Sequence, residues 1–404
     1  MRAMGVFCGI GSMLIGARQA GFQVIGNIEW RKYFHTGTFE YNFKNAWMVE
    51  VYKDLTEDQK KDIFGVDLVM GHPECGNFSN LRTKNIEKSL GDPGDIPFFV
   101  DIVSKIKPKF VVMDNLPRSF EAFSVVDYVE KLFDYDLFFE WISNYNYGNT
   151  QKERNRFFLI GARKDQNFVF QPGEFYHDKR MVDVIGDLPK YKNIYEINHV
   201  HFLENKYLRG WSGHNFDKFC PKGVRVTLRE FKEKIKNYPL KRNFVYYNLR
   251  KEKKQRIGHL KCDINHYSPV MTGGGFSRDN CFRSDTLNPL TPRERARIQG
   301  CPDDFIFQPL DLFKNNNYFK IYKQIGKFMP VEFCKYVADQ IKANLKNRNF
   351  ETTGDRLIKS NEYIDNAKKW YCKNVGYSNQ EETCRSCWMK NGCEVLKGIE
   401  FKIN

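Results

Sequence analysis

The chain has 404 residues, of which 41% are hydrophobic and 15% aromatic, and its formal net charge is +15. This length and composition exclude a disordered chain and predict two or three domains that bury a large core. No apolar run approaches the roughly 20 residues of a membrane-spanning helix, and the N-terminus lacks the apolar stretch and cleavage site of a signal peptide. We therefore exclude a membrane protein and expect a cytoplasmic one.

The charge and the cysteines are the two unusual features of this composition. A sequence pI of about 9.1 suits a nucleic-acid partner, although many basic proteins bind none. The 11 cysteines are a large number for a reducing compartment, where disulfides rarely persist. Seven are scattered through the first 334 residues and four crowd into the last 33, which predicts a metal or cluster site in the tail.

Short apolar runs and helical patterns alternate through the first 165 residues. The expected strands are Met4–Cys8, Phe22–Ile28, Asp67–Met70, Phe110–Met113 and Arg156–Gly161, and the expected helices are Met13–Ala20 and Pro97–Ile106. This order predicts an α/β fold with a doubly wound parallel sheet. Such sheets bind ligands at the carboxyl ends of their strands.

The alternation stops after residue 165. Residues 166–282 hold basic runs, aromatic residues and three consecutive glycines, which predict a second, smaller and irregular domain. Regular structure returns in residues 283–345, where Val331–Leu345 has the pattern of a helix. We therefore expect residues 1–165 and 283–345 to form one domain, followed by a Cys-rich extension over 346–404.

A Gly-rich turn follows the first expected strand. Gly9 and Gly11 stand where the turn opens a helix, so the backbone can approach a ligand closely and offer free N–H groups. Glu29 ends the next strand, where a carboxylate can accept both ribose hydroxyls of an adenosine. By itself this pattern describes equally well a tight turn in any α/β protein.

Reactive side chains follow the later strands. Cys75 lies in the turn after Asp67–Met70, and Asp114 ends the next strand. Arg154 and Arg156 precede a further strand, so a thiol, an acid and two cations are expected on one rim of the sheet. Such a set suits covalent attack on an electron-poor ring, with the acid and cations stabilising negative charge.

With these motifs in order, the chain resembles the DNA (cytosine-5) methyltransferase family. The family's opening motif is matched by Phe7, Gly9 and Gly11, its second acidic position by Glu29 and Trp30, its adenine-contacting acid by Asp54, and its two return motifs by Leu290–Phe305 and Tyr322–Gly326. The resemblance implies the Rossmann-like S-adenosylmethionine-dependent methyltransferase fold. In that fold, residues 166–282 would be the target-recognition domain.

The resemblance also implies a mechanism. A cytosine is flipped out of double-stranded DNA, and Cys75 attacks C6. A carboxylic acid at Asp114 bonds N3, C5 takes a methyl group from S-adenosylmethionine, and loss of the C5 proton expels Cys75. Arg156, with Arg154, contacts the base and orients the loop that carries the nucleophile. We expect a monomer in a bacterial cell or a phage-infected host.

Four positions depart from the family pattern. Glu74 replaces the proline before the nucleophile, Asp114 replaces a glutamate, one extra residue separates Gln151 from Arg154, and Lys327 follows Gly326 in place of an asparagine. We expect Glu74 to disfavour the Cys75 thiolate unless it points away. Asp114 is one methylene short of the usual reach to N3, so either Glu74 or a water completes the contact, or a small backbone shift lets Asp114 suffice.

Lys327 has two interpretations. It is a solvated surface charge, or it pairs with a carboxylate on an altered cofactor. In the second case carboxy-S-adenosylmethionine would be the cofactor, and the product would be a carboxymethylated base.

The tail cysteines have the spacing C-x11-C-x2-C-x5-C, formed by Cys372, Cys384, Cys387 and Cys393. Four thiolates suit a [4Fe–4S] cluster or tetrahedral zinc, and the last three resemble the iron–sulfur loop of endonuclease-III type glycosylases. A set of unligated thiols is the remaining alternative. For the whole chain, the alternatives to a DNA methyltransferase are a tRNA cytosine-5 methyltransferase and a DNA-binding member that has lost catalysis.

Overall fold

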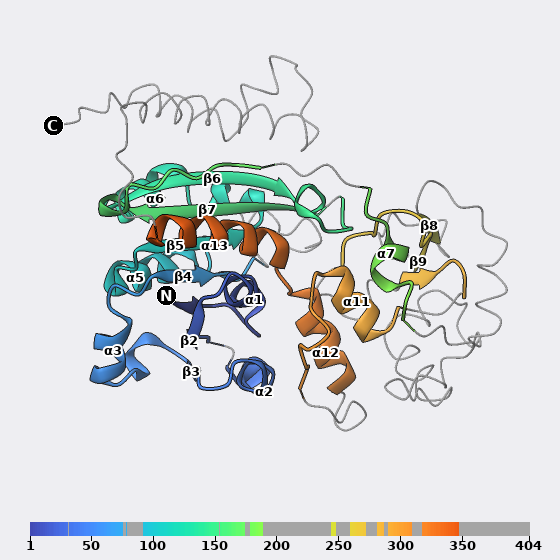
Figure 1. Ribbon diagram of the computed structural model, residues 1–404, viewed down its shortest axis with the longest axis horizontal. Coiled ribbons are helices and arrows are strands. Elements are labelled where there is room, and N and C mark those ends of the chain that lie inside the picture. Colours follow the sequence, from blue (N-terminus) through green and yellow to red (C-terminus); the bar gives the residue numbers. More distant parts are fainter. Residues whose placement is uncertain are drawn as a thin grey trace, which may run out of the picture.

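A twisted sheet with helices on both faces forms the centre of the molecule (Figure 1). The computed structural model describes residues 1–30, 32–75, 78, 92–152, 154–173, 178–188, 244–247, 259–271, 281–286, 290–308 and 317–346. None of the helices in these ranges is long and apolar enough to cross a membrane.

The central sheet has seven strands in the order β3-β2-β1-β4-β5-β7-β6. Their bounds are β1 (Arg2–Val6), β2 (Gln23–Ile28), β3 (Trp47–Val49), β4 (Leu68–Gly71), β5 (Phe110–Asn115), β6 (Tyr135–Ser143) and β7 (Asn155–Arg163). The first five pair in parallel, as the sequence predicts. The expectation of a wholly parallel sheet is wrong for β7, which runs antiparallel to both β5 and β6.

Strands β1, β4, β5 and β7 are buried on both faces, and successive side chains point into opposite layers. Phe110 and Val112 of β5 join one apolar cluster, whereas Val111 and Met113 join the other. The first cluster is covered by α1 (Ser12–Gln19) and α13 (Val331–Lys346), and the second by α3 (Glu57–Ile63), α5 (Ile96–Ile106) and α6 (Val125–Lys131). This arrangement is the three-layered α/β architecture that the alternation of elements predicts.

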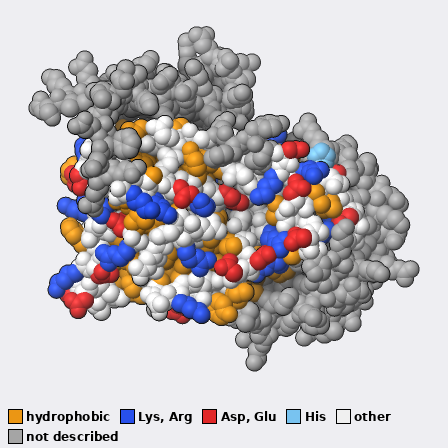
Figure 2. Space-filling view, viewed as in Figure 1, with side chains coloured by type: hydrophobic (Ala, Val, Ile, Leu, Met, Phe, Trp, Pro, Cys, Tyr) orange, Lys and Arg blue, Asp and Glu red, His pale blue; other side chains and the backbone are white. Residues whose placement is uncertain are grey.

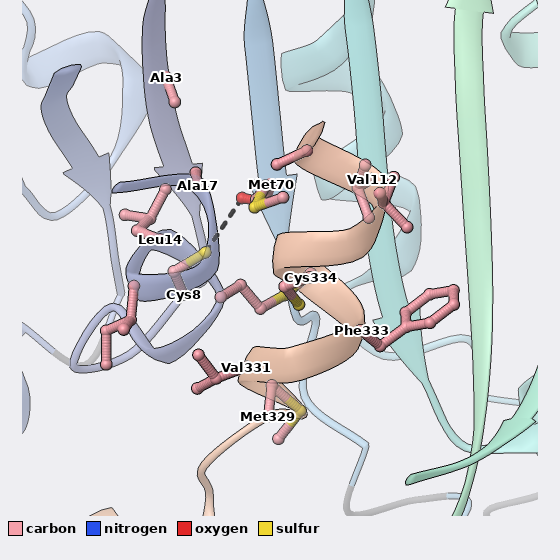
Figure 3. Packing of buried hydrophobic residues seen from close by; sticks show 14 of the residues in the cluster. Ala3, Cys8, Leu14, Ala17, Met70, Val112, Met329, Val331, Phe333 and Cys334 are labelled. Atoms are coloured by element: carbon pink, nitrogen blue, oxygen red, sulfur yellow. Dashed lines mark hydrogen bonds between the residues drawn. The ribbon is translucent and has the colours of Figure 1, made fainter. Parts of the chain in front are cut away.

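The C-terminal helix α13 completes the core of the N-terminal segment. It packs on α1 at Gly16, where a Cβ would lie 2.6 Å from the backbone nitrogen of Lys335. Figure 3 shows Phe333 of α13 pointing away from the turn that carries Cys8, and its ring packs against Phe158 of β7 with centroids 4.4 Å apart. Cys334 belongs to the same buried cluster as Cys8. Segments more than 300 residues apart in the sequence therefore share one core.

A smaller part of the molecule lies beside the central sheet (Figure 1). It contains a three-stranded sheet of β8 (Phe244–Tyr247), β9 (His259–Cys262) and β10 (Cys281–Arg283), with α7 (Met181–Ile185) and α11 (Pro292–Ile298). Its separate apolar cluster includes Met181, Cys262 and Ile298. Phe168 and Phe170, by contrast, pack into the core of the central sheet.

Most of residues 166–282 and all of the tail after residue 346 lie outside the described residues, so the expected domain boundaries stay predictions. In the view of Figure 2, the described basic side chains lie interspersed with acidic ones. Within that described surface, neither the basic nor the acidic side chains form a continuous patch. The basic runs between residues 232 and 256 are outside it.

Candidate active site

The Gly-rich turn and the segment that carries Cys75 meet between β1 and β4, where the strand order of the sheet reverses. From β1 the chain proceeds through β2 and β3 to one edge, and from β4 through β5 to the other. The loops after β1 and β4 therefore leave the sheet towards opposite edges, which is the arrangement at which doubly wound sheets bind ligands. The Gly-rich turn follows β1 and the segment from His72 to Cys75 follows β4, so both border this switch point.

The turn after β1 has a conformation that requires glycine. Gly9 has φ 57° and Gly11 has φ 88°, both in the left-handed region. A Cβ on Gly11 would also lie 2.5 Å from the ring of Phe43. Gly11 is the N-cap of α1, and the first N–H groups of a helix have no partner within it and can bind a ligand's polar groups.

The predicted cofactor residues follow β1, β2 and β3 in turn. The backbone N–H of Gly9 donates to Oε2 of the buried Glu29 at 2.8 Å, which ties the two motifs together. Trp30 packs edge-on against Phe7, with ring centroids 5.5 Å apart. Asp54 is exposed and ends the 3-10 turn η1 (Tyr52–Asp54) after β3. A glycine turn, an acid and an aromatic wall at one edge fit an adenosine-containing cofactor.

The antiparallel direction of β7 is what brings Arg156 to the catalytic rim. Asp114 is near the end of β5 and Arg156 is near the start of β7, and only an antiparallel pair places those two ends together. The Nε of Arg156 donates to Oδ1 of Asp114 at 2.8 Å, and its Nη2 donates to Oδ2. Burial alone would raise the pKa of Asp114, but the charges and hydrogen bonds of Arg156 and His72 together outweigh it and hold that pKa below its usual range.

His72 is the residue that sequence reasoning missed. Its Nδ1 lies 2.8 Å from Oδ2 of Asp114 and 3.1 Å from the carbonyl oxygen of the same residue. Burial favours neutral His72, but the charge of Cys75 and the hydrogen bond with Asp114 raise the pKa of His72 to about 9. The available signal was a histidine three residues before a cysteine at a strand end, the usual composition of a nucleophile with its base.

Cys75 differs from the buried cysteines around it. Burial alone would raise the pKa of Cys75, yet the charge of His72 and a side-chain hydrogen bond from it lower that pKa. The pKa values of Cys8, Cys301 and Cys334 are instead raised, in each case chiefly by burial. Figure 3 shows Cys8 and Cys334 among apolar side chains, with the Cys8 thiol donating to the carbonyl of Met70 at 3.0 Å. Cys75 therefore has the environment of a nucleophile and these others do not.

Arg154, just before β7, contacts the later part of the chain at Met271, Gln299 and Phe328. Its Nη1 donates to the carbonyl of Met271 at 2.8 Å and to Oε1 of Gln299 at 2.6 Å, and its Nη2 donates to the carbonyl of Phe328. Burial, assisted by the neighbouring charge of Arg156, lowers the pKa of Arg154 to about 10. These contacts are to backbone and amide oxygens that hold the return segment in place. Contact of Arg154 with the base stays a prediction.

Two of the family departures contact each other. Nζ of Lys327, just after α12 (Asn317–Gly326), lies 3.3 Å from Oε2 of Glu74. Both side chains are about one-third exposed, at 35% and 31%. The carboxylate beside the nucleophile thus has a cation of this chain as a partner, and Lys327 is more than a solvated surface charge.

The four tail cysteines predicted as metal ligands, Cys372, Cys384, Cys387 and Cys393, lie outside the described residues. Within the part of the chain that is described, no group of three or more His, Cys, Asp or Glu side chains is placed to hold a metal ion. The metal or cluster therefore stays a prediction.

Residues 1–343 match the family model described as C-5 cytosine-specific DNA methylase, so the chain belongs to this family. It is a DNA cytosine-5 methyltransferase, as its motifs predict, and the family depends on S-adenosylmethionine.

Similar proteins agree with this membership over nearly the whole chain. The type II methyltransferase M.FnuDI of Fusobacterium nucleatum is 27% identical, with 86% of this chain and 96% of the relative covered. The type II methyltransferase M.NgoPII of Neisseria gonorrhoeae is 28% identical at the same coverage. A solved structure of Spodoptera frugiperda DNMT2 superposes with a TM-score of 0.56 at 13% identity, covering 85% of this chain and 100% of that one. The last likeness shows the fold alone.

Proposed function

We propose that this enzyme methylates C5 of a cytosine in double-stranded DNA, with Cys75 as the covalent nucleophile. The observation that carries the proposal is the buried cluster of Asp114, Arg156 and His72 beside Cys75, in which the charges of His72 and Arg156 lower the pKa of the thiol. A thiolate is the reactive form of cysteine, and cations around it stabilise it at neutral pH. The target base would be flipped into this site, because a base inside the stack cannot present C6 to a thiolate.

Each side chain of the site has its own role in the proposed reaction. The Cys75 thiolate attacks C6 of the flipped cytosine, and the electron pair of the C5–C6 double bond moves towards N3. Arg156 orients Asp114 and stabilises negative charge on the base. Gly9, Gly11, Glu29, Trp30 and Asp54 would hold S-adenosylmethionine, which would supply an electrophilic methyl group for C5. Loss of the C5 proton then reforms the double bond and expels Cys75.

Glu74 is not required as a second acid in this mechanism. Glu74 forms an ion pair with Lys327, whereas both oxygens of Asp114 are held by Arg156 and His72. We favour Asp114 acting without help from Glu74. Turnover of Glu74→Gln and Asp114→Asn separates the two interpretations. A loss of activity in Asp114→Asn alone supports our choice, and equal losses in both support compensation.

Methyl transfer is favoured over carboxymethyl transfer. The carboxylate of Glu74 already faces the ammonium of Lys327, so a cofactor carboxylate is not needed to balance that cation. Mass spectrometry of DNA treated with S-adenosylmethionine or carboxy-S-adenosylmethionine tests this choice. Preferential use of the carboxylated cofactor would reverse it.

Covalent trapping tests the function as a whole. Purified protein and S-adenosylmethionine are incubated with duplex DNA or with tRNA containing 5-fluorocytosine, and the Cys75→Ser variant is the control. A Cys75-dependent adduct on DNA supports the proposal. An adduct confined to RNA would indicate a tRNA methyltransferase, and no adduct on either would indicate a non-catalytic member. Sequencing of modified cytosines in mixed DNA then identifies the target.

For the tail, we retain the prediction that Cys372, Cys384, Cys387 and Cys393 hold a metal. Metal analysis of anaerobically purified protein separates the alternatives: iron with absorbance near ~400 nm indicates a cluster, stoichiometric zinc indicates a zinc site, and neither indicates free thiols.

A further inference from the structure

The imidazole of His72 lies between the nucleophile and the buried acid. Its Nδ1 lies 2.8 Å from the carboxylate of Asp114 and 3.3 Å from Nη2 of Arg156, and the ring is close enough to Cys75 for each side chain to shift the pKa of the other. Because Asp114 is an acceptor, it holds Nδ1 in the protonated form, and Nε2 becomes the nitrogen that gains and loses a proton. A histidine oriented in this way by a carboxylate is suited to serve as a base for a thiol.

Asp114 by itself is a poor source of the proton that N3 needs. Its side chain is fully buried, its two oxygens accept hydrogen bonds from Arg156, and His72 contacts one of them. Its pKa is held low, so near neutral pH it is an ionised acceptor with no proton to give. His72, whose pKa is raised, is the neighbour that does carry an exchangeable proton.

The charges facing Cys75 come from several elements. His72 and Glu74 belong to the same turn, and Arg156 and Arg154 come from β7 and the segment before it. Asp114 comes from β5, and Lys327 contacts Glu74 from the return segment. Arg156 and His72 both favour the thiolate and Glu74 opposes it, with its charge countered by Lys327.

We propose that His72 is a catalytic residue that carries the Cys75 proton to N3 of the cytosine, an assignment that rests on the methyltransferase function proposed above. The S–H bond of Cys75 breaks as an N–H bond forms at Nε2 of His72. The thiolate electron pair forms the bond to C6, the C5–C6 electrons shift towards N3, and N3 takes the proton from His72. After the C5 proton is lost to solvent and the thiolate leaves, the N3 proton returns through His72 to Cys75.

The principal test is the pH dependence of Cys75 alkylation by iodoacetamide, read by mass spectrometry of its peptide. In the wild-type enzyme we expect the reaction to persist at about pH 6, since an ion-paired thiolate ionises well below the ordinary pKa of about 8.5. His72→Asn keeps a donor in the place of Nδ1 for Asp114 but cannot accept the proton. Its alkylation at about pH 6 should be about 100-fold slower and should rise with pH like an ordinary thiol.

A matched variant and a second readout control for folding. His266→Gln alters a half-exposed histidine whose Nε2 lies 4.0 Å from Asp263, and it should keep the wild-type profile. Binding of S-adenosylmethionine and the urea unfolding midpoint should be retained in His72→Asn. If His72→Asn fails to fold, His72→Gln, which mimics Nε2, replaces it. An unchanged alkylation profile in a folded His72 variant would overturn the proposal.

The trapping experiment separates this inference from the proposed function. With 5-fluorocytosine DNA, His72→Asn should form the adduct about 100-fold more slowly than wild type near neutral pH, and the difference should narrow in alkali. A wild-type rate in this variant refutes the role of His72 and leaves Cys75 as nucleophile. Absence of any wild-type adduct refutes the proposed function instead.

Discussion

The two sides of the site, one after β1 and β2 and the other after β4 and β5, are built by different means. The side after β1 and β2 consists of backbone: a turn with two left-handed glycines, the start of a helix, and Glu29 bound by the N–H of Gly9. The side after β4 and β5 consists of charged and polar side chains packed together, with Asp114 and Arg156 buried as a pair. The first is contiguous in sequence apart from Glu29, whereas the second collects groups from four segments.

This difference shows how each side resists change. A backbone turn depends on its own conformation and on the space around it, so it is sensitive to the addition of a single Cβ. A buried charge depends on its partner, because an unpaired ion inside a protein costs several kcal/mol. A substitution on the cofactor side should therefore disturb only the turn that contains it. On the catalytic side, a substitution should also destabilise the charged partner of the residue that is replaced.

The largest effect is expected on catalysis at Cys75. Cys75→Ser should lower turnover by at least about 1,000-fold, because a serine hydroxyl is not ionised at neutral pH, and it should abolish the adduct with 5-fluorocytosine DNA. Cys301→Ala, at a buried thiol whose pKa is raised, should lose a little stability and keep the adduct. Retention of the adduct in Cys75→Ser would contradict the assignment of the nucleophile.

The next effect is on stability, from breaking the buried pair. Arg156→Met should destabilise the protein by about 3–5 kcal/mol in urea unfolding, since Asp114 stays buried without its main partner. Arg163→Met is the matched control on the same strand, because Arg163 also binds a carboxylate through two nitrogens, at 2.8 and 2.9 Å. Its partner Asp165 is 57% exposed, so we expect a loss of at most about 1 kcal/mol. Equal losses in both variants would remove the distinction between buried and exposed pairs.

A smaller loss of stability is expected on the cofactor side. Gly11→Ala combines a positive φ with a contact of 2.5 Å to Phe43, so it should cost about 2–3 kcal/mol and weaken binding of S-adenosylmethionine. Gly148→Ala has a similar φ of 92° with nothing within 4 Å, and it should cost only about 1–2 kcal/mol. Thermal unfolding measures the stability of each variant, and calorimetry measures its binding of S-adenosylmethionine. A milder effect at Gly11 than at Gly148 would argue against the close packing of this turn.

The smallest effect is expected at the partly exposed pair beside the nucleophile. Glu74 raises the pKa of Cys75, so Glu74→Gln should shift the alkylation profile to lower pH. Lys327→Met removes the countercharge of Glu74 and should shift it to higher pH, by about one unit or less in either case. The double variant should lie between them. Shifts of the same sign in both single variants would show that the pair acts through backbone position rather than charge.

Much of this site is readable from the order of residues. The expected strand ends place the glycine turn, Cys75 and Asp114 at one sheet edge, because parallel strands end together, and the structure places them there. Arg156 was expected on the same rim, but through a parallel strand that would have carried it to the opposite edge. The antiparallel β7 resolves this, and no local pattern specifies strand direction.

The sequence by itself determined the family, the positions of the strands and the identity of the candidate nucleophile, because those depend on local patterns and on motifs in fixed order. Only the tertiary structure decided that His72 contacts Asp114, that Glu74 meets Lys327 and that Arg154 binds the returning chain. These partners lie between 42 and 253 residues apart. Burial makes the pairings of Asp114 and Arg154 obligatory, since a buried charge or donor must find a partner, but only the path of the chain decides which partner it finds.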